Sequence, residues 1–475
     1  MTWLHYVGAL LVLGAIIAVG VSSGRSVKSS GDFTGGSQKA GVALVTGAMT
    51  GTIIGGASTI GTAQLAYTNG LSAWWFTIGA GLGALLLTGL VPRLYTCGRN
   101  TLPEIVGAEF GQRASSLMAV LSSAGIFGSV VSQLLSGVAL VTAVAGLISP
   151  VLALVLVFGL IVTYVIFGGL LSAGRAGVLK TALIVGTLVI CGSLVIWRMG
   201  GLAMFTNPLL TALPANVYFD FFGRGYGVEI GNCMSLLLGV SSEQAYFLAL
   251  RSARSLRVSR AGVGLAAGLM PVVGGLGVLI GLDMKASGRE IQPSLALPMF
   301  ILDRLPALPA GMMLAALLIV VVGSAAGLCF GIATVLVRDL ILPVRKNLFK
   351  KTSRISLPAW TRVVLLAVLG AAALVAFADP SALIMDWSFL ALGLRACVSF
   401  FPLMAALFFP GRVHRGFALA AMVAGPGFTG LGAWLLPATI DPILPGMAAA
   451  FGCVLAGFVF QKWISAQKRL QPPVA

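Results

Sequence analysis

Charged side chains are scarce in this sequence, and acidic ones are the scarcest. Only 9% of the 475 residues are charged, with 13 Asp and Glu against 30 Lys and Arg, whereas 58% are hydrophobic. A mean hydropathy of +1.02 excludes an ordinary soluble domain. No cluster of His, Asp or Glu falls at one depth along the apolar segments, which argues against a membrane-embedded enzyme. The composition predicts a multi-pass membrane protein.

Motifs for nucleotide binding and hydrolysis are also missing. The sequence has no P-loop and no metalloprotease motif, so any uphill transport would have to use an ion gradient. Its six cysteines show no CxxC or paired spacing, so we expect no disulfide and no cofactor beyond a coupling ion. The basic residues lie between apolar segments rather than in one patch, so we expect no nucleic-acid partner.

What the sequence does contain is a series of long apolar segments. Windows of about 20 apolar residues are typical of transmembrane helices. They predict thirteen spans, at 4–21, 41–68, 71–92, 115–147, 150–169, 179–198, 228–248, 260–282, 310–337, 359–377, 384–409, 416–436 and 441–461.

The distribution of Lys and Arg between these spans predicts their orientation. If the N-terminus is outside, 24 of these residues fall in cytoplasmic segments and five in outer segments, with Arg395 inside a span. Cytoplasmic loops are enriched in Lys and Arg, so we expect the C-terminus in the cytoplasm and the protein in the cell (inner, cytoplasmic) membrane. The Pro-containing outer loops at 199–227 and 283–309 are expected to be either short gating helices or passive connectors.

The segment at 41–67 is long enough to cross a bilayer but is rich in glycine. Gly51, Gly55, Gly56 and Gly61 cluster near its centre. Each glycine costs a helix interior about 1 kcal/mol relative to alanine, so the cluster predicts a break in the middle of the membrane. Transporters use such breaks to expose backbone carbonyls to a substrate or ion.

Six local patterns carry a resemblance to a known family. They are GGASTIGTAQLAYTNGLSAWW at 55–75, TLPEIVGAEFG at 101–111, YVIFGGLLSAGRAGVLKTALIVG at 164–186, SSEQAYFLALRSARSLRVSRAG at 241–262, GSAAGLCFGIATVLVRDLILP at 323–343 and FPLMAALFFPGRVHRGFALAAMVAG at 401–425. In this order they resemble the sodium/solute symporter family, which includes the sodium/glucose and sodium/proline symporters. Each pattern alone is weak, but six in order are much more specific.

The resemblance implies an all-α polytopic fold of the leucine-transporter type, with two inverted five-helix repeats. The second interrupted span, at 227–246, contains Gly231 and Gly239, and paired interruptions in two halves point to a central binding site. The implied organisation is a first helix and loop at 1–40, a first repeat at 41–198, an outer loop at 199–227, a second repeat at 228–377, and three helices with a basic tail at 378–475.

The same resemblance implies a sodium site between the broken helix and the ninth predicted span. Its carbonyl donors fall on Gly51 and Ile54, and its two hydroxyl positions, counted back from Asp339, fall on Gly323 and Ser324. Gly323 departs from the family because it supplies no hydroxyl, so three donors remain. Ser324 also has an alternative role in packing between helices.

Arg395 lies inside a predicted span, where a charge costs about 2.5 kcal/mol or more and is usually functional or paired. An arginine facing a water-filled cavity suits a carboxylate, because its planar fork presents paired donors. The alternatives are an ion pair with Asp386 or Glu243, or a position nearer the cytoplasm. Glu243 could itself be a proton carrier, a gate residue or an ion-pair partner of Arg251, and we favour an ion pair.

Uncharged polar residues inside the spans are further candidates for a substrate cavity. A polar stripe on one helix face includes Ser129, Ser132 and Ser136, at spacings of three and four residues. The polar residues of this stripe and of the second interrupted span could equally line a cavity or form hydrogen bonds with a neighbouring helix. The cavity candidates are Ser58, Gln133 of the stripe, Asn232 and Ser235.

These features predict a secondary active transporter, not an enzyme, that takes up a small polar organic solute by alternating access. Sodium is the coupling ion that the resemblance implies, and Arg395 favours a monocarboxylate or amino acid over a sugar. One alternative is a proton-coupled or uncoupled carrier with a degraded sodium site. Another is a membrane sensor or receptor on a transporter scaffold, against which the absence of a cytoplasmic signalling domain argues. The expected partners are the solute and the lipid bilayer, and the oligomeric state is open.

Overall fold

The structure of the protein is a computed structural model. It describes residues 2–24, 39–99, 101–146, 148–168, 175–201, 207–337 and 357–470. Five regions named in the sequence predictions lie outside these residues: most of the loop after the first span, 169–174 of the pattern at 164–186, 202–206 of the first outer loop, Asp339 with the basic stretch around it, and the end of the C-terminal tail.

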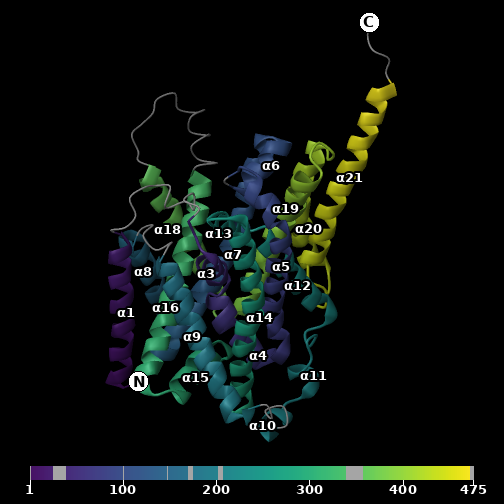
Figure 1. The fold of residues 1–475 in the computed structure, drawn as a ribbon. Coiled ribbons are helices and arrows are strands. Elements are labelled where there is room, and N and C mark those ends of the chain that lie inside the picture. The colour runs from purple at the N-terminus through teal and green to yellow at the C-terminus, as the bar shows by residue number, and fades with distance from the viewer. Residues whose placement is uncertain are drawn as a thin grey trace.

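Within the described residues, regular structure is helical except for one parallel bridge between Ala40 and Ala253. The long helices run side by side in a bundle, with α1 beginning at one end and α21 projecting beyond the other (Figure 1). In chain order the elements are α1 (Trp3–Gly24), α3 (Val42–Ile53), η1 (Ala57–Gly61), α4 (Thr62–Asn69), η2 (Gly70–Trp74), α5 (Trp75–Thr96), α6 (Leu102–Phe110), α7 (Gln112–Ala145), α8 (Pro150–Gly168), α9 (Arg175–Arg198), α10 (Pro208–Thr211), α11 (Ala215–Tyr218), α12 (Tyr226–Ser241), α13 (Gln244–Arg251), α14 (Leu256–Ala286), η5 (Pro293–Leu295), α15 (Ala296–Arg304), α16 (Ala307–Val335), α18 (Leu357–Ala378), α19 (Ile384–Phe408), α20 (Arg415–Leu435) and α21 (Ile443–Leu470).

Each of the thirteen predicted spans overlaps a helix or a broken pair of helices. In the described part of the chain, nine helices are long and apolar enough to cross a membrane, or up to ten if the bent pair α12 and α13 is one span. Three apolar stretches are shorter, at Trp3–Gly14, Val42–Ile53 and Pro150–Tyr164. The all-α polytopic class is confirmed. The count of thirteen, the repeat boundaries and the orientation of the termini stay predictions.

Both interrupted segments are broken, but not both by glycine. The first changes from α3 to the π-helical turn η1 where the glycines cluster. The second bends by 43° between α12 and α13, at Ser242 and Glu243 rather than at the two glycines. Those glycines permit close packing instead, because a Cβ at Gly231 would lie 2.2 Å from Cβ of Asp441 and one at Gly239 would lie 2.7 Å from a backbone oxygen of α19.

The helices form two groups that meet along a seam. In the first group, α5 packs on α12 and α14, and α14 also packs on α3 and α4. In the second, α7 packs on α6, α8, α16, α18 and α19. The groups meet where α12 packs on α19 and where α9 packs on α3, α14 and α16. The turn η1 contacts both α7 and α19, so the first break faces this seam.

Local sequence explains where several helices begin and end. The Thr101 side chain accepts the Glu104 amide at the start of α6, and Ser255 accepts the Val258 amide at the start of α14. α7 ends at Gly146, whose φ of +63° is a conformation that glycine adopts without strain. These caps satisfy amides and carbonyls that a helix end otherwise leaves unpaired.

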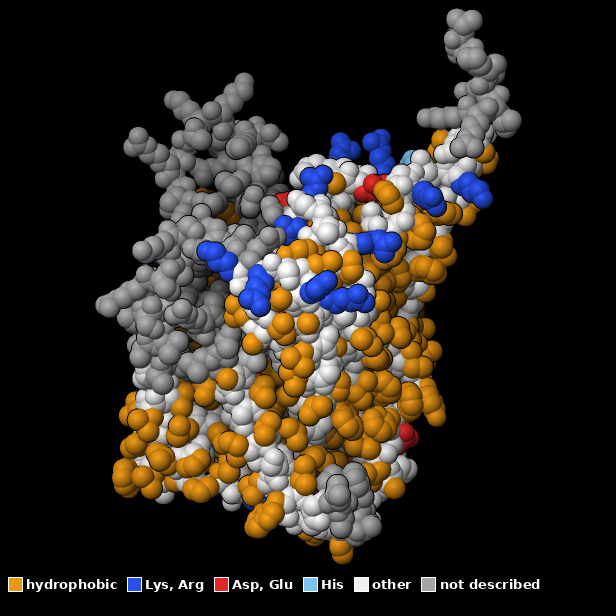
Figure 2. Space-filling view, in the orientation of Figure 1, with side chains coloured by type: hydrophobic (Ala, Val, Ile, Leu, Met, Phe, Trp, Pro, Cys, Tyr) orange, Lys and Arg blue, Asp and Glu red, His pale blue; other side chains and the backbone are white. Residues whose placement is uncertain are grey.

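The two ends of the bundle differ in charge. Lys and Arg side chains gather at the end from which α21 projects, above a broad band of hydrophobic side chains (Figure 2). The opposite end carries α10, α11, η5 and α15, so the two Pro-containing loops do form short helices (Figure 1). We refer to these as the basic end and the opposite end, and the basic end is the one expected to face the cytoplasm.

Candidate functional site

The first break begins at Gly55. In an α-helix this amide would donate to the carbonyl of Gly51. Instead it donates to the Ile53 carbonyl at 2.9 Å and to Ser58 Oγ at 3.0 Å. The Ser58 hydroxyl in turn donates to the Ile53 carbonyl at 2.9 Å, and its side chain is fully buried. Ser58 therefore holds the broken backbone rather than standing free in a cavity.

Gly56 makes the second departure from the helix. Its amide donates to Oε1 of Gln133 on α7 at 3.1 Å, whereas a continuous helix would direct it to the carbonyl of Thr52. A Cβ at Gly56 would lie 2.3 Å from Ser136 Oγ, so only glycine allows α7 to come this close. Together the two departures leave the carbonyl oxygens of Gly51 and Thr52 without their helical donors.

The four residues of the predicted cation site come from α3, the residue after it, and α16. Gly51 and Ser324 are half-buried, whereas Ile54 and Gly323 are buried. α9 packs against both α3 and α16 and is therefore their shared neighbour. Carbonyl and hydroxyl oxygens are the ligands that hard cations prefer, so these two helices offer suitable donors.

The second break carries a buried ion pair. Glu243 lies in extended backbone between α12 and α13, and its Oε1 accepts a hydrogen bond from Nη1 of Arg395 on α19. The side chains of Arg395 and Glu243 are only 6% and 10% exposed. Arg395 also donates from Nη2 to Ser129 Oγ and from Nε to the Ala391 carbonyl, each at 3.3 Å. The guanidinium thus joins α19 to α7 and to the second break.

Comparison with known proteins identifies the family. A model of the sodium:solute symporter family matches residues 33–425. The chain belongs to this family. An uncharacterized symporter of Bacillus subtilis (strain 168), YwcA, is 25% identical over 264 residues, which cover 54% of this chain and 50% of that protein. The chain thus spans about half the length of this curated relative in the match.

Solved transporters share the fold of this chain. A Na+-coupled sialic acid symporter, in a substrate-bound outward-open state, matches with a TM-score of 0.74 and 18% identity over 97% of this chain and 98% of that one. Mhp1 in an inward-facing conformation matches with a TM-score of 0.58 and 12% identity over 91% and 92%. Both likenesses support the predicted leucine-transporter type of fold, and at these identities they show the fold alone.

The polar stripe on α7 of the symporter is engaged by protein groups. Ser132 accepts a hydrogen bond from Ser388 of α19 at 2.8 Å, and Ser136 donates to the Ser132 carbonyl at 2.8 Å. As described above, Gln133 accepts a hydrogen bond from the Gly56 amide at the first break, and Ser129 accepts one from Arg395. The stripe therefore ties α7 to both breaks.

A second group of charges lies on α12 and α19, towards the opposite end. Nε of Arg224 donates to Oε1 of the fully buried Glu229 at 3.0 Å, and its Nη1 donates to Oδ1 of Asp386 at 3.1 Å. Burial lowers the pKa of Arg224, but the bonds and charges of both carboxylates raise it by more, so the guanidinium stays charged. Asp386 is therefore the partner of Arg224, and Arg395 pairs with Glu243.

Asn232 contacts this second group of charges, whereas Ser235 bonds its own helix, and neither contacts the second break. Asn232 Nδ2 donates to Glu229 Oε2 at 3.4 Å, and Ser235 donates to the Gly231 carbonyl at 2.8 Å. Asn232 precedes Glu243 by eleven residues, about 16 Å along an α-helix. The structure thus brings Ser58 and Gln133 together at the first break but does not join Asn232 and Ser235 to Arg395.

Two polar residues were missed by the sequence predictions. Glu229 lies within the predicted span at 228–248, and its charge inside an apolar segment could have identified it. Gln64 is 2% exposed; its Oε1 accepts the Ile384 amide at 3.0 Å and its Nε2 donates to the Ala382 carbonyl at 3.4 Å. It therefore fastens α4 to the start of α19.

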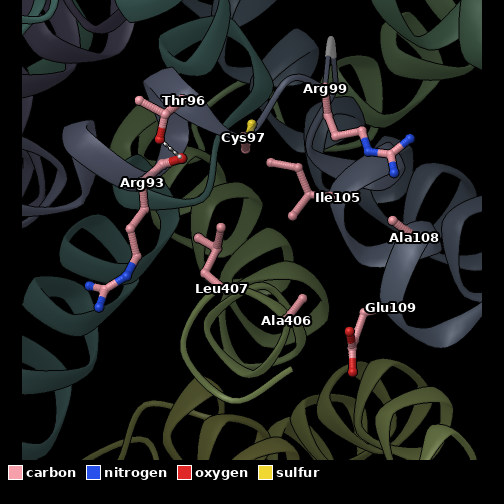
Figure 3. A pocket seen from close by; sticks show the side chains of 9 residues that line it. All are labelled: Arg93, Thr96, Cys97, Arg99, Ile105, Ala108, Glu109, Ala406 and Leu407. Atoms are coloured by element: carbon pink, nitrogen blue, oxygen red, sulfur yellow. Dashed lines mark hydrogen bonds between the residues drawn. The ribbon is translucent and has the colours of Figure 1, made fainter. Parts of the chain in front are cut away.

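A cavity of about 360 Å³ opens at the basic end of the symporter, between α5, α6 and α19 (Figure 3). Arg93 and Glu109 lie on different sides of it, and the Arg93 guanidinium stacks 3.9 Å from the ring centroid of Phe408. None of the predicted site residues lines this cavity, so it is separate from the two breaks. Its lining is Arg93, Thr96, Cys97, Arg99, Ile105, Ala108, Glu109, Ala406 and Leu407.

Proposed function

We propose that this symporter is a secondary active transporter that couples the entry of sodium to the uptake of a small polar organic solute. The observation that carries the proposal is the first break, where the Gly51 and Thr52 carbonyls lose their helical donors in a chain of the sodium:solute symporter family. Transporters of this kind hold coupling ions with carbonyls of interrupted helices. No covalent step is required.

The proposed cation site uses the Gly51 and Ile54 carbonyls and the Ser324 hydroxyl. Gly51 and Ser324 are half-buried, and we propose that an ion reaches both of them between α3 and α16. Gly323 contributes no side-chain oxygen, so the ion would complete its coordination with water or the solute. An ion bound in this way would favour the conformation in which α3 and α16 are close, because a ligand shifts an equilibrium only by its differential affinity.

The proposed solute is a monocarboxylate or an amino acid, bound through Arg395. A carboxylate on the solute would take the place of Glu243 on the guanidinium fork, since both are planar acceptors of paired N–H donors. A neighbour of the same fold transports sialic acid, which is also an acid. Ser58 and Gln133 would support the solute at the first break, and Asn232 and Ser235 would contact it on its way from the opposite end.

We propose that two hydrogen bonds at the opposite end form part of a gate for alternating access. Tyr67, near the end of α4, donates its hydroxyl to the Arg289 carbonyl at 2.9 Å. Gln64 on the same helix holds the start of α19 through the Ile384 amide. These bonds would have to open before a solute could reach the breaks from that side.

A proton-coupled carrier is the second candidate, and Gly323 and Glu243 favour it. Gly323 removes a sodium ligand, and Glu243 is a buried carboxylate whose charge would be left unpaired if an anionic solute displaced it from Arg395. Replacing sodium with choline separates the two functions. Unchanged uptake in choline at constant pH gradient would support the proton-coupled candidate and contradict sodium coupling.

The test is uptake by the purified symporter in liposomes with an inward sodium gradient. A panel of labelled monocarboxylates, amino acids and neutral sugars would be compared in sodium and in choline. We expect accumulation of at least one carboxylate in sodium only, lost in Arg395→Gln and partly kept in Arg395→Lys. Arg412→Gln, which replaces an exposed arginine at the basic end, is the control that should transport normally. Equal uptake by the Arg395 variants would contradict the carboxylate proposal.

A further inference from the structure

The exposed face of α14 forms a continuous stripe. Leu265, Leu269 and Val272 are 51%, 37% and 60% exposed, and Ala261 is exposed one turn before them. Spacings of three and four residues place these side chains on one side of the helix. An apolar stripe that is exposed on a membrane-spanning helix faces lipid.

At its N-terminal end this stripe changes from apolar residues to arginines. Arg254, Arg257 and Arg260 are exposed, and they follow one another at intervals of three residues. Arg257 precedes Leu265 by eight residues, about 12 Å along the helix, so it lies on the same face two turns nearer the basic end. These arginines therefore sit where the hydrocarbon band gives way to the lipid headgroups.

Nothing in the described protein compensates these three charges. None of them forms an ion pair with a described carboxylate, and the first turn of α14 has no acidic residue. Like charges three residues apart destabilise a helix, and so do positive charges at its N-terminus. A ligand of opposite charge would remove both penalties.

We propose that Arg254, Arg257 and Arg260 form a binding site for the headgroup phosphate of an anionic phospholipid. A guanidinium fork matches the geometry of phosphate oxygens, and basic residues at the membrane surface attract anionic lipids. The apolar stripe of α14 receives the acyl chains of the same lipid. This site is distinct from the two breaks and from the cavity beside α5.

A short backbone bridge connects the site to Ala40, just before α3. The Ala40 amide donates to the Ser252 carbonyl and the Arg254 amide donates to the Ala40 carbonyl, both at 3.0 Å. Ala40 lies just before α3, and Ser252 directly follows α13. The bridge links Arg254 to the start of α3 and the end of α13, so a headgroup bound at Arg254 would act on those two helix ends.

The test uses the purified full chain and needs no transported substrate, so its failure is distinguishable from a failure of the proposed function. The protein is transferred from phosphatidylcholine and phosphatidylglycerol mixtures into detergent, and retained phosphatidylglycerol is counted by native mass spectrometry. The variant is R254Q/R257Q/R260Q. The control is R412Q/R415Q/K462Q, which removes three exposed positive charges from the same end.

We expect the α14 variant to bind phosphatidylglycerol at least about tenfold more weakly than wild type, and the control to bind within about twofold. Phosphatidylglycerol should also slow amide exchange at Ala40 and Arg254 in wild type and in the control only. Equal retention by the α14 variant and wild type would overturn the proposal, as would equal losses in both variants. Displacement of the lipid by glycerol phosphate would assign the site to a soluble phosphate ester and would also overturn it.

Two further measurements keep the proposal testable if the glutamine variant does not fold. R254K/R257K/R260K keeps the charge and is expected to retain most of the lipid preference. In wild type, the preference for phosphatidylglycerol over phosphatidylcholine should fall as salt is raised, because exposed charges are screened. A preference that does not change with salt would overturn the electrostatic basis of the site.

Discussion

The two helix breaks in this chain are stabilised by different kinds of side-chain interaction. The first is held by neutral groups, with Ser58 and Gln133 taking the amides that no longer continue the helix. The second is held by a charge pair between Glu243 and Arg395. The first leaves carbonyl oxygens free, which suits a bare cation, and the second presents a guanidinium, which suits an anionic group. This difference is the basis for our proposal that the ion binds at the first break and the anionic group of the solute at the second.

The largest effect is expected from breaking the charge pair at the second break. Either Arg395→Gln or Glu243→Gln should lower the free energy of unfolding by about 3–5 kcal/mol, because one buried charge is left unpaired. Denaturation in detergent micelles measures this change. Arg289→Gln, whose partner Asp303 is 32% exposed, is the matched control and should cost about 1 kcal/mol or less.

A double substitution sharpens that result. Replacing both partners with leucine removes the unpaired charge, so the double variant should be more stable than either single variant. A double variant as unstable as the sum of the singles would contradict the description of Glu243 and Arg395 as a coupled ion pair.

The first break should respond to volume rather than to charge. In Gly56→Ala the added Cβ would lie 2.3 Å from Ser136 Oγ and 2.9 Å from Gln133 Oε1, so overpacking should cost about 1–3 kcal/mol of unfolding free energy. Gly89→Ala in α5 is the control, because its Cβ would have no neighbour within 4 Å. That variant should be as stable as wild type or up to about 1 kcal/mol more stable. Equal effects at both glycines would contradict the close approach of α7.

The smallest effect is expected from restoring a missing oxygen donor. Gly323→Ser should strengthen sodium binding by about 0.5–1.5 kcal/mol, roughly two- to tenfold in Kd, if the site lies between α3 and α16. Sodium-dependent thermal stabilisation measures the change. Gly327→Ser, one turn further along α16 at an open position, should leave the sodium Kd unchanged. A gain in both variants would place the effect outside the proposed site.

The sequence predicted the first break well because the clustered glycines lie where the backbone departs from helical geometry. Gly55 and Gly56 lie at the departure itself. The second break was misplaced for the same reason. Gly231 and Gly239 are required by close packing against Asp441 and α19, whereas the chain bends at Ser242 and Glu243, which carry side chains. A glycine in a span therefore does not show by itself whether it marks a break in the helix or a close contact between two helices.

The sequence could not predict which residues on distant helices form side-chain pairs. Arg395 was noticed because a charge inside a span is expensive, but its two proposed partners lay 9 and 152 residues away, and only the packing of α12 on α19 selects Glu243. Gln64 likewise bonds a residue 320 positions later. Periodicity and spacing describe neighbours along one helix, so contacts between distant helices escape them.

Binding of radioactive sodium to the purified protein measures directly whether a cation site lies between the first break and α16. We expect saturable binding in wild type that is strongly weakened in Ser324→Ala. Ser235→Ala, a buried serine that bonds its own helix on α12, should bind sodium as wild type does. Absence of saturable binding in wild type, or equal binding in Ser324→Ala, would contradict a cation site between the first break and α16.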